Sequence, residues 1–177
     1  MEAKLKSLPR NAVKLLPGIL RERFDVNRYY LMSLDSAALL FNHRAEAVLS
    51  QMIHEAESHS GWEHPGCMLR GHFLGHWLSA AARIYASTGD RQIKAKADYI
   101  VDELGKCQEH NGNGWLGSIP EKYLEKVVRK QKVWAPHYTL HKTLMGLWEM
   151  YEYAENEKAL ALLEEFADWF EKRAAGR

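Results

Sequence analysis

The stretch GHFLGHWLSAAARIYASTGD, residues 71–90, is repeated in outline by PHYTLHKTLMGLWEMYEYAEN, residues 136–156. Each stretch opens with a histidine, an aromatic residue and a second histidine four positions after the first. The opening histidines, His72 and His137, lie 65 residues apart. Each stretch then continues through a mostly apolar run to a tyrosine and a short turn. The spacing of the apolar positions predicts that both stretches form α-helices.

A second, more amphipathic stretch follows each of these helices. It carries the pattern Ala-Asp-aromatic-apolar, at residues 97–100 in the first case and 167–170 in the second. Two consecutive helix pairs of one design predict a helical-hairpin repeat. The first helix of each pair is apolar nearly all round, so we expect it to be the inner, buried helix. The second keeps a charged face, so we expect it to be the outer one.

Helical periodicity dominates the rest of the chain, and few stretches alternate as strands do. We expect helices over residues 20–34, after Asp35 or Ser36, and over about 67–88, 90–109, 120–130, 136–154 and 157–173. The last helix should bury a stripe made of Leu160, Leu163, Phe166, Ala167 and Phe170. The chain is therefore predicted to be all-α, as a single domain over residues 1–177 whose residues 1–19 form an extended lead-in.

Several helix ends are marked by residues with known end preferences. Asp35 and Asp90 are good N-caps, Pro136 suits the first helical position, and Gly89 suits the position after a helix. The segments HSGWEHPGC and HNGNGWLGSIP contain too many glycines and prolines for a helix, so both are predicted to be loops.

Composition excludes some classes of function. The chain has 24 basic and 23 acidic residues and a net charge of +1, so no basic field for nucleic acid is expected. No run of about 18 apolar residues predicts a membrane span, and the interrupted start does not resemble a signal peptide. The two cysteines, Cys67 and Cys107, are expected to be reduced thiols. These observations predict a cytoplasmic protein.

Five stretches together resemble a known family. They are RFDVNRYYLMSLDSAALLFNHR (23–44), GWEHPGCMLRGHFLGHWLSA (61–80), TGDRQIKAKADYIVDELGKCQ (88–108), GWLGSIPEKY (114–123) and VWAPHYTLHK (133–142). They look like the N-terminal half of glycoside hydrolase family 127, the β-L-arabinofuranosidase family. The similarity extends from about Val13 to Trp169, and GHFLGHWLSA followed by WLGSIPEKY is its most specific part.

The resemblance implies an (α/α)6 toroid, of which this chain would supply about half. It also implies a zinc ion held by three cysteines and a glutamate, with one cysteine as the nucleophile and another glutamate as the acid/base. Those residues lie in a later part of the family's chain, and neither Cys67 nor Cys107 matches one of the family's zinc-binding or catalytic cysteines. We therefore assign no catalytic or metal-binding residue here and expect zinc only in the complete family enzyme.

The pair His72 and His76 has three readings from the residues alone. One helical turn apart, the imidazoles can bind a metal, line a polar pocket, or serve as structural residues at a helix start. Phe73 stands where the HExxH zinc motif has its glutamate, which disfavours a metal. A four-histidine site with His137 and His141 would require the two inner helices to be neighbours and lies outside the common zinc sets.

The resemblance favours a sugar pocket and indicates five substrate-binding residues: His76, His141, His72, Trp115 and Tyr138. Neutral imidazole offers one donor and one acceptor to a sugar hydroxyl. Aromatic rings can stack on a sugar or simply fill the core. Glu63 and Glu121 also lie in matching motifs, and the residues alone do not show whether they face each other.

Two functions are compatible with this pattern. The first is an incomplete or split glycoside hydrolase that contributes part of the sugar-binding pocket for an arabinose-containing glycan or oligosaccharide and is inactive alone. Such a half-barrel would have an apolar open edge, which a complementing chain or a second copy would cover. The alternative is a non-catalytic helical module that binds carbohydrate or protein.

Overall fold

The computed structural model describes residues 8–48 and 58–175. Two short 3₁₀ helices, η1 (Arg10–Ala12) and η3 (Gly61–Glu63), accompany seven α-helices: α1 (Ile19–Ser33), α2 (Ser36–Glu46), α3 (His72–Thr88), α4 (Arg91–Asn111), α5 (Lys122–Val128), α6 (Pro136–Ala154) and α7 (Glu157–Ala175). These ranges contain no strand. The all-α prediction is confirmed.

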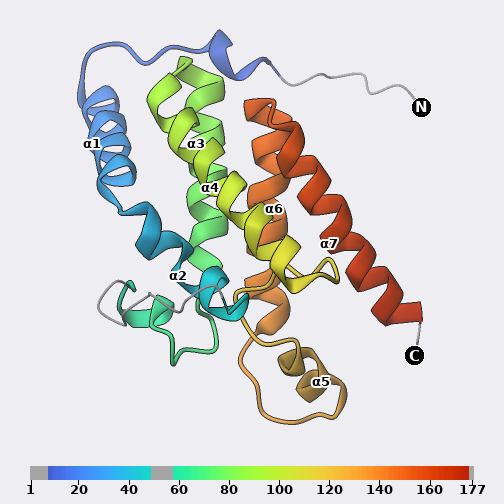
Figure 1. Ribbon diagram of the computed structural model, residues 1–177. Helices are drawn as coiled ribbons and strands as arrows, with labels where there is room; N and C mark the ends of the chain where they lie inside the picture. The colour runs from blue at the N-terminus through green and yellow to red at the C-terminus, as the bar shows by residue number, and fades with distance from the viewer. Residues whose placement is uncertain (1–7, 49–57, 176–177) are drawn as a thin grey trace.

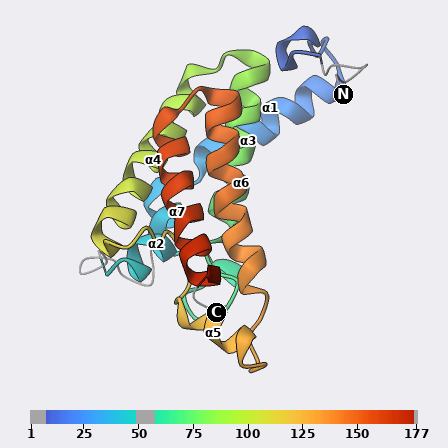
Figure 2. The same ribbon diagram turned by 90° about the vertical axis from the view of Figure 1, so that its right-hand side faces the viewer.

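The helices form two layers. Helices α3 and α6 lie side by side, α4 packs against α3, and α7 packs against α6 (Figures 1 and 2). The two hairpins of the sequence repeat, α3–α4 and α6–α7, therefore sit next to each other with their first helices in contact. This arrangement matches the predicted inner and outer helices and is consistent with part of an (α/α)6 toroid.

Two glycines let α3 and α6 approach closely. A Cβ atom added to Gly75 would lie 1.9 Å from the carbonyl oxygen of Lys142, and one added to Gly146 would lie 2.7 Å from the carbonyl oxygen of Gly75. No side chain fits at either position. Backbone contact at this crossing fixes the register of the two helices, which places their N-terminal turns at the same end of the molecule.

Most helix ends are where the sequence predicts them. The Asp35 carboxylate accepts from the amide of Ala38, Asp90 accepts from the amides of Gln92 and Ile93, and Pro136 opens α6. Gly89 ends α3 with a left-handed φ of 73°.

Helix α3 is the exception, because it begins at His72 and not near residue 67. The carboxylate of Glu63 accepts hydrogen bonds from the amides of Gly71 and Phe73. Free backbone N–H groups at the start of α3 are thus bonded by a residue that lies outside the helix. Gly71 itself has a φ of 83° and ends the preceding turn.

The buried face of α7 differs from the predicted stripe. Phe166 is buried as expected, but Ala167 is exposed and Leu160 and Leu163 are half-buried. The fully packed positions are Ala159, Leu162, Phe166 and Trp169. Both sets have helical spacing. The large Trp169 ring, which packs on Trp115 with centroids 4.5 Å apart, determines which face turns inward.

The segment before α1 runs over the C-terminal ends of α3 and α6 (Figure 1). Its 3₁₀ turn places the Arg10 guanidinium 3.9 Å from the centre of the Tyr153 ring on α6. The predicted lead-in thus ends where α1 begins, at Ile19, and its first seven residues lie outside the described part.

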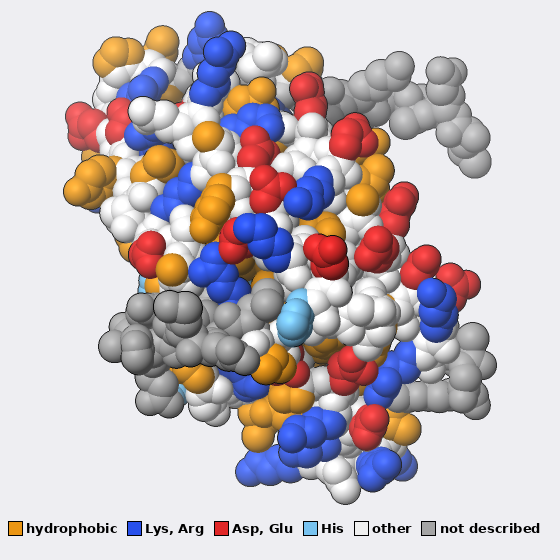
Figure 3. All heavy atoms as spheres, in the orientation of Figure 1, with side chains coloured by type: hydrophobic (Ala, Val, Ile, Leu, Met, Phe, Trp, Pro, Cys, Tyr) orange, Lys and Arg blue, Asp and Glu red, His pale blue; other side chains and the backbone are white. Residues whose placement is uncertain are grey.

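The surface is mixed in charge. On the face drawn in Figure 3, Lys and Arg side chains alternate with Asp and Glu side chains. Across the described ranges, no helix is both long and apolar enough to cross a membrane. The inner helix α6 keeps one face at the surface, with Tyr138, His141 and Trp148 exposed, because no further helix within residues 8–48 and 58–175 covers it.

Candidate functional site

The N-terminal turns of α3 and α6 bring three of the predicted site residues together. His76 Nε2 lies 3.2 Å from the hydroxyl oxygen of Tyr138. The His72 ring lies 6.0 Å from that of His76 and 5.8 Å from that of Tyr138, centroid to centroid. Two imidazoles and a phenol, from two different helices, therefore share one small surface.

Two tryptophans extend this surface. Trp62 lies 6.2 Å from His72 between ring centroids, and its ring meets Trp134 edge-on at 6.1 Å. Trp62 is 62% exposed, Trp134 49% and Tyr138 41%. The sequence analysis did not select either tryptophan. Both tryptophans lie in loops in or beside the motifs that resemble the family. Loop residues are less constrained by core packing, so this position could have indicated a binding role.

Glu63 lies behind His72. Its Oε1 atom is 2.7 Å from His72 Nδ1, and the carboxylate also accepts from the amides of Gly71 (2.7 Å) and Phe73 (3.0 Å). The side-chain amide of Asn42 donates to the Glu63 carbonyl at 2.8 Å. Glu63 is buried, so these contacts hold the carboxylate in one position.

The two histidines have opposite pKa shifts. The hydrogen bond to Glu63 raises the pKa of His72, although burial opposes it. Burial, followed by the nearby charges of Lys142 and His72, lowers the pKa of His76. Burial alone would raise the pKa of Glu63, but hydrogen bonds from His72 and from the Phe73 and Gly71 amides together hold it below its ordinary value. The site thus favours protonation of His72 and disfavours protonation of His76.

A buried polar group lies next to this site. His43 Nε2 lies 3.3 Å from Thr143 Oγ1, and burial lowers the pKa of His43 to about 4. Of the seven buried polar side-chain atoms that make no hydrogen bond within the described part of the chain, three lie on α2 and the start of α6: Asn42 Oδ1, His43 Nδ1 and Thr139 Oγ1. Such atoms usually contact ordered water.

The remaining predicted site residue of α6, His141, lies on the exposed side of the helix. His141 is exposed, and its charge contributes to the lowered pKa of His76. The ammonium of Lys142 lies 4.8 Å from the centre of the Tyr138 ring. His137 is also exposed. The α6 turn therefore adds polar and cationic groups to the rim of the surface.

Comparison with protein families identifies the chain. A family model described as the catalytic domain of β-L-arabinofuranosidase, glycoside hydrolase family 127, matches residues 12–176. The chain belongs to this family. A search of curated proteins found no significant match.

In this family 127 chain, Trp115 is not near the histidines. It is 2% exposed and packs against Phe166 and Trp169, so neither ring face is open to a ligand. The glycine-rich loop that carries it is pressed onto α7, where a Cβ on Gly114 would lie 2.8 Å from the carbonyl oxygen of Glu165. The structure places Trp115 in the core, and not on the pocket rim where the sequence analysis expected it.

The described residues do not fit the zinc ion that the family resemblance implies. Within residues 8–48 and 58–175, no three His, Cys, Asp or Glu side chains are grouped closely enough to hold a metal ion. Both cysteines are free thiols: Cys67 is half-buried, and burial raises the pKa of Cys107 to about 12. We therefore derive no metal-dependent step from these side chains.

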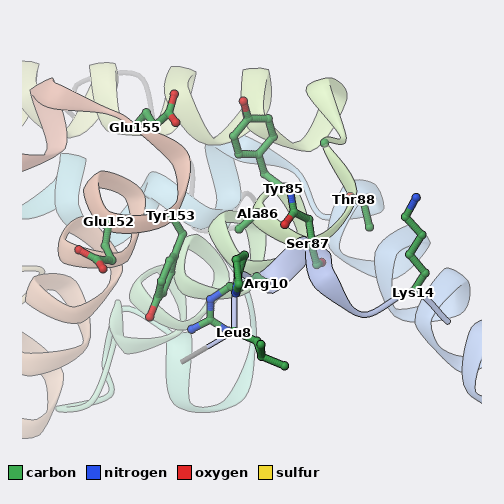
Figure 4. Close-up of a pocket in the computed structure, with 13 residues that line it drawn as sticks. Leu8, Arg10, Lys14, Tyr85, Ala86, Ser87, Thr88, Glu152, Tyr153 and Glu155 are labelled. Carbon is green, nitrogen blue, oxygen red and sulfur yellow. The ribbon is translucent and has the colours of Figure 1, made fainter. Parts of the chain in front are cut away.

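A large hollow of the family 127 chain lies at the opposite end of α3 and α6. It is a groove of about 1030 Å³ between the N-terminal segment and the C-terminal turns of both helices. Figure 4 shows the guanidinium of Arg10 beside the Tyr153 ring, with the carboxylates of Glu152 and Glu155 nearby. None of its lining residues is one of the predicted site residues. The candidate site is therefore the histidine end, where three of the predicted residues come together.

Proposed function

We propose that the surface formed by His72, His76, Tyr138, Trp62 and Trp134 binds the sugar of an arabinose-containing glycan or oligosaccharide. In this proposal the chain contributes part of the sugar-binding pocket of a glycoside hydrolase that resembles β-L-arabinofuranosidases. The observation that carries it is the contact between His76 and Tyr138, beside exposed tryptophan rings, in a chain of family 127.

The chemistry of the surface suits a sugar. A sugar carries hydroxyl groups on its edges and C–H groups on its faces. Imidazole and phenol groups can donate to and accept from the hydroxyls, and tryptophan rings can pack against the C–H faces. Few convergent polar groups on an otherwise aromatic surface are typical of small-molecule sites.

The binding test is titration of the purified chain with a methyl arabinofuranoside, followed by NMR or calorimetry. His76→Ala and Trp62→Ala should each weaken binding by about two- to tenfold, the effect of losing one hydrogen bond or one stacking contact. His110→Ala, on the outer helix α4, and Trp148→Ala, further along α6, are matched controls that should leave binding unchanged. Equal loss in all four variants would contradict this site.

We further propose that the chain alone does not hydrolyse glycosides. The catalytic cysteine, glutamates and zinc ligands of the family have no match among its residues, so a complementing chain or further residues would supply them. An assay of the purified chain with an arabinofuranoside should release no sugar. Release by the chain alone, lost in His76→Ala and therefore not due to a contaminant, would show that this proposal is wrong.

A second candidate is a non-catalytic helical module that binds carbohydrate or protein. The exposed apolar side chains of α1, which include Ile19, Val26 and Tyr29, favour a protein partner. Sugar binding that persists, while no complementing protein restores hydrolysis, would favour this module over the split enzyme.

A further inference from the structure

We propose that Glu63 is a positioning residue of this site: it holds the Nδ1 edge of His72 and leaves Nε2 as the ring nitrogen that donates to the sugar. This inference rests on the proposed function, because it assumes that the surface binds a sugar. Glu63 contacts no exposed part of the surface itself. It is buried behind His72, and its direct contact within the proposed surface is with that imidazole.

The carboxylate is held firmly enough to orient a ring. Each of its oxygens accepts from a backbone amide of the turn that opens α3, Oε2 from Gly71 and Oε1 from Phe73. The same Oε1 lies 2.7 Å from His72 Nδ1. Asn42, on α2, fixes the backbone of Glu63 through its carbonyl. Contacts from two segments, the turn that opens α3 and helix α2, thus determine where the carboxylate lies, and through it the plane of the imidazole.

The contacts of Nδ1 fix the proton on that nitrogen. Besides Glu63, the carbonyl oxygen of Leu69 lies 2.9 Å from His72 Nδ1. A carbonyl and a carboxylate are both acceptors, so Nδ1 must carry the hydrogen. The second nitrogen, Nε2, makes no hydrogen bond to the residues that the structure describes. It is therefore the ring atom available to a ligand.

The charge on His72 decides what Nε2 offers. Glu63 and the Leu69 carbonyl favour the protonated ring, while burial and Lys142 from α6 oppose it; the rings of His76 on α3 and Tyr138 on α6 face His72. The balance raises the pKa of His72, so Nε2 is a charged donor over a wider pH range than in an isolated histidine. His76, whose pKa is lowered, stays neutral and can accept. The pair then suits two hydroxyl groups of one sugar, one accepting from His72 and one donating to His76.

The test is Glu63→Gln, with the His72 ring followed by ¹⁵N NMR across a pH titration. In the unchanged protein we expect a His72 pKa above the ordinary 6.5 and the proton on Nδ1 in the neutral form. Glu63→Gln removes the negative charge, so the His72 pKa should fall, and sugar affinity at neutral pH should drop by roughly tenfold, the effect of losing a charged hydrogen bond. Glu63→Asp keeps the negative charge, so it should restore part of the His72 pKa and part of the sugar affinity.

Glu121→Gln is the matched control, because this carboxylate also lies in a family motif but hydrogen-bonds Asn113 and not a histidine. Glu121→Gln should change neither the His72 pKa nor the sugar affinity. An unchanged His72 pKa in folded Glu63→Gln would overturn the inference. If Glu63→Gln fails to fold, the tautomer of neutral His72 in the unchanged protein still tests the inference. A proton on Nε2 and not on Nδ1 would overturn it. A His72 pKa that shifts as expected, in a chain that binds no sugar, would support the positioning and refute the proposed function alone.

Discussion

At the scale of single residues, His43 shows how burial and charge compete. It lies on α2, is 1% exposed, and has one hydrogen-bond partner, Thr143. Glu63 is close enough to favour its protonation, but burial is the larger effect and lowers the pKa of His43 to about 4. His43 is therefore mostly neutral in the folded protein above about pH 4.

This shift predicts acid sensitivity. The unfolded chain binds a proton at His43 near pH 6.5 and the folded chain near pH 4, so stability is lost as the pH falls through this window. The loss reaches on the order of 3 kcal/mol, at about 1.4 kcal/mol per pH unit. Urea unfolding of the protein and of His43→Gln between pH 7 and pH 4 measures it. The variant should show the smaller decline, and parallel curves would contradict the assignment to His43.

The residues of the site differ in how well sequence predicts them. The repeat predicts that His72, His76 and Tyr138 lie on equivalent helix starts, and the close crossing of α3 and α6 brings them together. Glu63 could be noticed in its motif but not paired with His72, because that contact depends on how a loop folds back. Trp115 was misplaced because loops are usually exposed, whereas this one is covered by α7.

At the scale of elements, the crossing of α3 and α6 is the decisive contact. Gly75 lies against the backbone of Lys142 and Thr143, and Gly146 lies against Gly75. A backbone neighbour cannot move aside as a flexible side chain can. Sequence periodicity predicts both helices but not this crossing. A glycine inside a helix lowers the helix propensity, and the sequence alone does not show that close packing is the reason for it.

Gly75→Ala should therefore destabilise the protein strongly. The new methyl group would lie 1.9 Å from a carbonyl oxygen, so the helices must separate, at a cost of about 1–3 kcal/mol or more. Gly105→Ala on α4 is the matched control, because its nearest neighbour is the flexible end of Lys158 and alanine favours a helix. Urea unfolding of both variants gives the comparison. Equal stability of the two would contradict close packing at Gly75.

Helix ends show which elements sequence predicts well. Asp35, Asp90 and Pro136 act on their own helices within three residues, so local preferences are enough to place those ends. The start of α3 depends on Glu63, eight residues before Gly71, and was placed too early. Local sequence patterns thus predict the helix ends that are capped by neighbouring residues. They miss a helix end that is capped by a side chain further away in the chain.

At the scale of the whole molecule, α1 is the least covered helix. It packs on α3, yet Ile19, Leu20, Val26, Tyr29 and Tyr30 are all exposed. Apolar side chains gathered along one helix favour association, because contact removes them from water. The proposed complementing chain or second copy would find its largest apolar contact here.

We predict that the chain self-associates through α1 at high concentration. Light scattering after size-exclusion chromatography should give a mass above the 20.4 kDa of one chain. Val26→Glu with Tyr29→Glu should return the mass to that of a monomer, while Val128→Glu, at another exposed position on α5, should not. A monomer at every concentration would argue against an unpaired apolar edge.

The backbone contact between α3 and α6 also has a consequence for engineering. Main chain, and not side chains, sets the distance between the histidine pair and Tyr138. The frame of the site should consequently tolerate exchange of its tryptophans, Trp62 and Trp134, without a change in helix spacing. Libraries that randomise these two positions, with both glycines kept, offer a route to altered ligand preference on an unaltered scaffold.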